Sequence, residues 1–164
     1  MRKGSAKAVA MGGVFAALAT VIMCLGGLIP VATYVCPILC MLILQIVHQR
    51  CGKRIAWTWY ACVAILSLLV CPDKEAAGVF LFLGYYPIVK QGLDKRKLGI
   101  LWKLLLFNGS VALLYMGLLY LMGMEEIAAE YAELGLWGLV LTLLLGNLTF
   151  LLTDKILTRL RFRK

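Results

Sequence analysis

The sequence has few of the residues that carry most enzyme and cofactor chemistry. Its 164 residues include a single histidine, His48, and only eight Asp and Glu side chains. One histidine without acidic neighbours makes a poor catalytic base or metal centre. No Gly-rich loop ends in Lys-Ser or Lys-Thr, so the chain lacks the phosphate-binding loop of an ATPase. The sequence therefore predicts no catalytic residues, no cofactor and no energy source of its own.

Metal-binding cysteine patterns are also missing. None of the six cysteines forms the Cys-x2-Cys spacing that is typical of zinc sites. Cys36 and Cys40 share one face of a predicted helix, but a free cysteine in an apolar segment packs as a small hydrophobic side chain. We therefore expect no metal site.

No polar stretch is long enough to form a soluble domain. The chain instead has 63% hydrophobic residues and a mean hydropathy of +0.92, whereas a soluble domain is only about half apolar. The apolar residues come as long uncharged runs, and runs of about 18 or more residues are typical of membrane-spanning helices. The composition predicts an all-α membrane protein with one integral membrane domain over residues 1–164.

Charges and prolines divide the apolar sequence into six predicted transmembrane helices. The fourth has a short uncharged part, so we begin it at Pro72, because proline is favoured at the first helical position. The six predicted spans are Ala8–Ile29, Val31–Val47, Ile55–Cys71, Pro72–Val89, Leu98–Met124 and Leu134–Thr153.

Lysine and arginine lie almost entirely on one side of this six-helix arrangement. Of the 17 cations, 16 fall on the side that holds both termini, and Lys74 alone falls on the other side. Loops rich in Lys and Arg stay in the cytoplasm, so we predict that both termini are cytoplasmic. A basic surface with interleaved aromatic platforms, as nucleic-acid binding requires, is absent. The net charge of +9 therefore indicates orientation in a lipid bilayer and no nucleic-acid partner.

The first predicted span has a face of small side chains. Small residues let two transmembrane helices approach closely, whereas large apolar side chains contribute little to helix association because lipid tails are equally apolar. The face predicts a partner helix, which belongs either to the same bundle or to a separate protein. Its residues are Ala8, Gly12, Ala16 and Thr20 on one track, with Gly13 and Ala17 on the next.

With six predicted spans, both termini inside and an Ala-xxx-Ala type pattern at Ala8, Gly12 and Ala16, the chain resembles the substrate-binding S components of energy-coupling factor (ECF) transporters. In that family the first helix docks on a transmembrane T component, which links it to two cytoplasmic ATPases. The resemblance implies a multi-pass protein of the bacterial plasma membrane that captures a small solute, such as a vitamin or another micronutrient. A structural cell-envelope scaffold of the MreD type, which binds neighbours and no solute, accounts equally well for the topology.

Charged and aromatic residues gather at the predicted outer ends of the second and fourth helices. Asp73, Lys74 and Glu75 begin the fourth helix, and Tyr34 lies near the helix-breaking Pro37. Ionisable groups at membrane depth are costly and often functional. We therefore predict that Tyr34, Asp73, Lys74 and Glu75 bind substrate in an outward-facing pocket. The alternative is an ordinary solvated helix start.

Polar residues near the last two spans indicate structure rather than catalysis. Asn108 and Asn147 lie at similar predicted depths in the two spans, so we expect an interhelical hydrogen bond between them. Glu125 and Glu126 resemble the Glu pair of CAAX-type intramembrane proteases. The arginine expected four residues later is replaced by Glu130, so we predict no enzyme.

Overall fold

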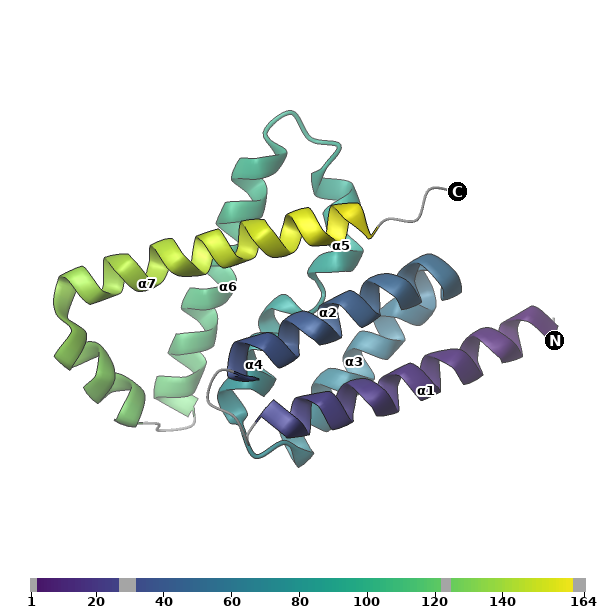
Figure 1. Cartoon of the computed structure of the whole chain (residues 1–164), viewed down its shortest axis with the longest axis horizontal. Helices are drawn as coiled ribbons and strands as arrows, with labels where there is room; N and C mark the ends of the chain where they lie inside the picture. Colours follow the sequence, from purple (N-terminus) through teal and green to yellow (C-terminus); the bar gives the residue numbers. More distant parts are fainter. Residues whose placement is uncertain (1–2, 27–31, 122–124, 161–164) are drawn as a thin grey trace.

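The computed structural model describes residues 3–26, 32–121 and 125–160, and every regular element in these ranges is an α-helix (Figure 1). In a bilayer a helix satisfies its own backbone hydrogen bonds, which explains why long apolar runs adopt this structure. Three predicted spans extend beyond the described residues, at 27–29, 31 and 122–124. The helices are α1 (Lys3–Leu25), α2 (Ala32–Cys51), α3 (Lys53–Val70), α4 (Lys74–Leu83), α5 (Tyr86–Leu93), α6 (Gly99–Leu121) and α7 (Glu125–Arg159).

Five of the helices are long and apolar enough to cross a membrane. These five correspond to all the predicted spans except the fourth, which confirms an all-helical chain suited to a bilayer. The five segments are Ala6–Leu25, Ala32–Cys51, Lys53–Val70, Gly99–Gly117 and Val140–Arg159.

The predicted fourth span, Pro72–Val89, is divided into α4 and α5 by a turn at Gly84 and Tyr85. Gly84 permits this turn, because a Cβ at this position would collide with the carbonyl oxygen of Phe80. Pro87 follows and lacks the amide hydrogen that a continuous helix would need here. The ten residues of α4 reach only about 15 Å, so α4 by itself does not cross a hydrocarbon core of about 30 Å.

The helices form two groups that α4 and α5 join. Figure 1 shows α1, α2 and α3 together in one group, whereas α6 runs across their direction and α7 crosses α6. Phe80 and Ile88 pack into the apolar cluster of α1–α3. Leu83 and Tyr86 pack into a second cluster with side chains of α6 and α7. The structure therefore differs from six helices that all run side by side.

Candidate functional site

Buried charges meet where α5, α6 and α7 come together. Lys90 of α5 and Lys103 of α6 are only 4% and 8% exposed, and both ammonium groups bind the carboxylate of Asp154 on α7. The distance from Lys103 Nζ to Asp154 Oδ2 is 3.0 Å. Tyr86 donates its hydroxyl hydrogen to the same carboxylate, and Asp94 forms an ion pair with Lys103. We call these five residues the inner charge cluster.

Helical spacing and aromatic packing position the inner charge cluster. Tyr86 and Lys90 are four residues apart on α5, which places both side chains on one face of that helix. Phe150, one turn before Asp154 on α7, packs edge-to-face on the Tyr86 ring at a centroid distance of 4.8 Å, and Phe107 of α6 stacks on Phe150. These rings keep water from one side of the cluster, and ion pairs are stronger where water is excluded.

The cluster balances its own charge. Burial disfavours the charged form of the Lys90 ammonium, while the carboxylate of Asp154 favours it. Lys90 also donates to the backbone oxygen of Asp154 at 3.1 Å. Two lysines face two aspartates, so the arrangement connects three helices with no net charge. A buried pair of this kind is weak evidence for stability, and a role in fixing one arrangement of the helices is the better-attested use.

Sequence reasoning missed this cluster. Lys90 and Lys103 contributed to the count of cytoplasmic cations, and Asp154 is followed by a strongly basic C-terminal segment that hides its significance. The one available signal was an isolated acid in the last apolar helix, since ionisable groups in such helices require a partner. The sequence does not identify the partner, because the two lysines come from other helices.

Asn108 of α6 and Asn147 of α7 form the predicted interhelical contact. Each side-chain amide donates to the other's carbonyl oxygen, at 3.0 and 3.1 Å. Each also donates to the backbone oxygen four residues earlier, Leu104 for the first and Leu143 for the second. The prediction of this hydrogen bond is confirmed, and the pair joins α6 to α7, which are two of the three helices that the inner charge cluster connects.

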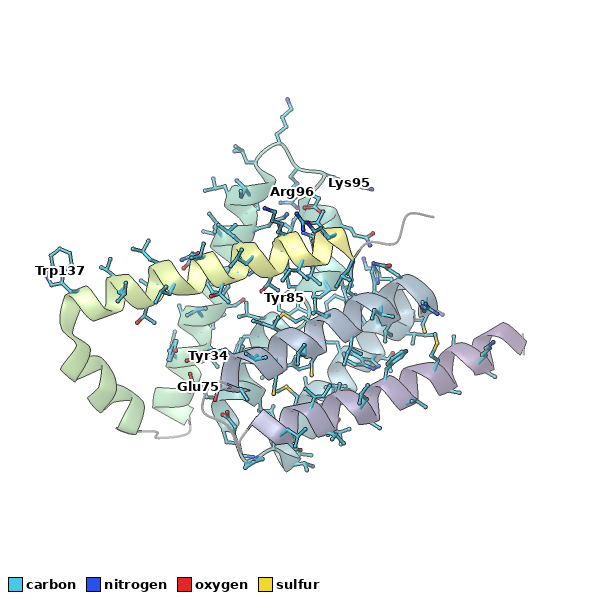
Figure 2. All side chains as sticks on the ribbon, viewed as in Figure 1. Tyr34, Glu75, Tyr85, Lys95, Arg96 and Trp137 are labelled. Carbon is cyan, nitrogen blue, oxygen red and sulfur yellow. The ribbon has the colours of Figure 1, made fainter. Side chains whose placement is uncertain are left out.

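At the opposite end of the fold, the structure brings together three of the four predicted substrate-binding residues. Tyr34 at the start of α2 donates to Glu75 of α4 at 2.7 Å, and Figure 2 shows the two side chains next to each other. Thr33 donates to Asp73 at 2.7 Å, and Asp73 also accepts the backbone hydrogen of Ala76 as the N-cap of α4. These contacts connect the beginnings of α2 and α4.

Lys74, the fourth predicted residue, has a different role. Its ammonium donates to the backbone oxygens of Leu68 and Cys71, at 2.8 and 2.9 Å. A cation at this position satisfies carbonyls that the end of α3 leaves without helical partners. Lys74 therefore caps α3 rather than pairing with its acidic neighbours on the chain. The assignment of these four residues to a substrate remains a prediction.

The small residues of α1 divide between two faces, and the first track faces the protein's own bundle. Gly12 is buried, and a Cβ at this position would lie 3.4 Å from Ile55 of α3. Ala8, Ala16 and Thr20 are half-buried, and the Thr20 hydroxyl donates to the backbone oxygen of Ala16. Close packing within one molecule therefore accounts for this track.

The second track faces away from the protein. Gly13 and Ala17 are exposed, and no atom lies within 4 Å of a Cβ built at Gly13. Ala6 and Ala10, which the four-residue repeat had left out, are exposed as well. We call these four residues the outward face of α1. The chain thus retains a strip of small side chains that its own helices do not cover.

No known family model, curated protein or solved structure matches this chain. Function is therefore argued from the three features described above, which are the inner charge cluster, the polar contacts between α2 and α4, and the outward face of α1. In the described ranges, no group of three or more His, Cys, Asp or Glu side chains is arranged to hold a metal ion.

Proposed function

We propose that the protein is the substrate-capture subunit of an ECF-type importer, which takes up a small solute such as a vitamin or another micronutrient. The outward face of α1 carries this proposal. Gly13 and Ala17 leave room for a second transmembrane helix to approach the α1 backbone. The partner helix belongs to a T component, and the associated ATPases supply the energy that this chain has no nucleotide-binding loop to obtain.

The proposal includes six membrane crossings, with both termini in the cytoplasm of a bacterial cell. α4 and α5 make the fourth crossing together, because the segment 74–93 reaches up to about 30 Å at helical rise, close to the thickness of a hydrocarbon core. One cation, Lys74, lies at one end of this pair, and three basic residues, 95–97, follow the other end. The positive-inside rule assigns the end with more cations to the cytoplasm. The turn at Gly84 is buried in protein, where a break in a membrane helix is tolerated.

The proposed solute site lies at the outer end of α2 and α4. Tyr34 is 49% exposed and its hydroxyl is bound to Glu75, so a polar ligand can replace this surface contact at little cost. Asp73 and Lys74 precede Glu75 on the chain; Asp73 caps the start of α4, and Lys74 caps the end of α3. We assign Tyr34 and Glu75 to ligand contact, and Asp73 and Lys74 to positioning the walls.

Substitutions on α1 test the docking proposal. We expect Gly13→Leu to abolish co-purification with a T component and its ATPases, and Ala17→Leu to do the same, because a large side chain there prevents close approach of the partner helix. The midpoint of thermal unfolding in detergent should stay unchanged, since Gly13 has open space around it. Co-purification would be followed by mass spectrometry of the affinity-purified complex.

Two control variants distinguish docking from folding. Val14→Leu alters a side chain that is 70% exposed on the same helix and should leave both the complex and the unfolding midpoint unchanged. Gly12→Leu should lower the midpoint, because a Cβ at Gly12 already lies 3.4 Å from Ile55 and a leucine side chain has no room between α1 and α3. An intact complex with both Gly13→Leu and Ala17→Leu would refute docking through this face.

One observation favours the alternative, an MreD-type scaffold without a solute. The charged groups at the outer end have partners within the protein, with Asp73 bound to Thr33, Lys74 bound to backbone oxygens and Glu75 bound to Tyr34. Native mass spectrometry of the purified protein separates the two functions. A retained small molecule that Glu75→Gln releases supports solute capture, whereas a bare protein in every preparation supports the scaffold.

A further inference from the structure

Two cysteines from distant parts of the sequence meet at one end of the α1–α3 group. Cys24 lies in the last turn of α1, and Cys71 is the residue that ends α3. Their Sγ atoms are 3.4 Å apart across 47 positions of sequence, and both thiols are free. Cys71 is completely buried, whereas Cys24 is half-buried. We propose that Cys24 and Cys71 are a disulfide-forming pair that a disulfide oxidant closes.

The geometry selects this pair over the other cysteines of the same apolar cluster. A disulfide bond is about 2.05 Å long, so the two sulfur atoms need to approach by roughly 1.4 Å. Cys36 and Cys40 are four residues apart on one helix, where Cβ atoms are about 5–6 Å apart, beyond the distance that a disulfide spans. The Cys40 thiol instead donates to the backbone oxygen of Ala19.

The oxidation proceeds by two thiol–disulfide exchanges. Cys24, the more accessible thiol, attacks as a thiolate on one sulfur of the oxidant's disulfide, which forms a mixed disulfide and releases the first oxidant thiol. The Cys71 thiolate then attacks Sγ of Cys24 and releases the second oxidant thiol. The two cysteines lose two protons and two electrons, and the oxidant's disulfide bond is reduced to two thiols.

The bond would connect the end of α1 to the junction of α3 and α4. Lys74 already binds the backbone oxygen of Cys71 at this junction. In the proposed orientation this end of the molecule faces the cell exterior, where disulfides persist. Since α1 carries the proposed docking face, oxidation would hold that helix in place against α3. The compartment rests on the proposed topology, whereas the pairing rests only on the geometry.

Thiol mapping of the full chain in its native membrane tests the pairing. Membranes are treated with dithiodipyridine, a small permeant disulfide, and remaining thiols are alkylated before mass spectrometry of the intact and digested protein. We expect a crosslinked peptide that joins Cys24 to Cys71 and is lighter by about 2 Da than the two reduced peptides together. A reacting thiol without a partner, such as the exposed Cys62, instead keeps a pyridylthio group as a mixed disulfide. Cys62→Ser, which removes an exposed thiol of α3, should leave the crosslink unchanged.

Single-cysteine losses make the result decisive. Cys24→Ser and Cys71→Ser should each abolish the crosslink, and the half-buried Cys24 provides a variant that retains the buried packing at Cys71. Cys24 and Cys71 that are alkylated or carry pyridylthio groups after oxidation, or a crosslink between other cysteines, would overturn the pairing. Protein isolated without added oxidant tests the proposed orientation separately. A crosslink that forms only after dithiodipyridine treatment would contradict the placement of this end at the cell exterior, but it would still support the Cys24–Cys71 pairing.

Discussion

Asp154 illustrates how much one side chain contributes at the residue scale. Its carboxylate receives Tyr86 and Lys90 from α5 and Lys103 from α6. An ammonium group as buried as that of Lys90 is costly without a counter-charge. The chain's cations therefore do not all serve orientation, because two of them, Lys90 and Lys103, are internal and neutralised.

The Asp154→Asn substitution tests the inner charge cluster. It removes the shared negative charge and leaves Lys90 buried without an anionic partner, so we expect a loss of about 3 kcal/mol in the free energy of unfolding. Reversible unfolding of the detergent-solubilised protein, followed by circular dichroism, measures this loss.

Asp94→Asn is the matched control. The Asp94 side chain is 33% exposed, and its partner Lys103 retains Asp154, so the expected loss is below about 1 kcal/mol. Equal losses for the two variants would show that Asp154 is not the shared counter-ion of both lysines.

At the scale of elements, the division of the predicted fourth span into α4 and α5 matters most. Phe80 and Ile88 pack toward α1–α3, while Leu83 and Tyr86 pack toward α6 and α7, so the residues around the turn connect the two apolar clusters. The turn also places Tyr86 at the beginning of α5, from which it reaches Asp154.

Gly84→Ala tests whether the turn is required. The added methyl group would collide with the carbonyl oxygen and the ring of Phe80, so we expect a loss of about 1–3 kcal/mol in the free energy of unfolding. Gly92→Ala on α5 meets no atom within 4 Å and should be neutral or stabilising by about 1 kcal/mol. If both variants unfold like the parent protein, the close approach at Gly84 is not a structural requirement.

For the whole molecule, the decisive question is whether α4 and α5 together cross the bilayer. Five crossings would place the two termini on opposite sides of the membrane, whereas six place both on the same side. Residues at both ends of the chain are basic, and the positive-inside rule therefore favours six. The distribution of charge, rather than the length of any single helix, supports this topology.

Fusions at the C-terminus determine the number of crossings. We expect a fluorescent protein after Lys164 to fold and fluoresce in a bacterial host, and alkaline phosphatase at the same position to stay inactive, because both report a cytoplasmic end. The same reporters after residue 72 provide the control for an outer position, with the opposite pattern expected. Active phosphatase after Lys164 would contradict the six-span topology.

The sequence by itself determined an all-helical chain with helices long and apolar enough to cross a membrane, and most helix positions, because run length and hydropathy are local properties. It also led to the Asn108–Asn147 contact, since two amides in apolar helices need partners. Only the tertiary structure decided that Gly12 faces α3 and Gly13 faces outward, and that Asp154 holds two lysines from other helices. Helical periodicity defines which residues share a face, but the neighbour of each face depends on how the helices pack.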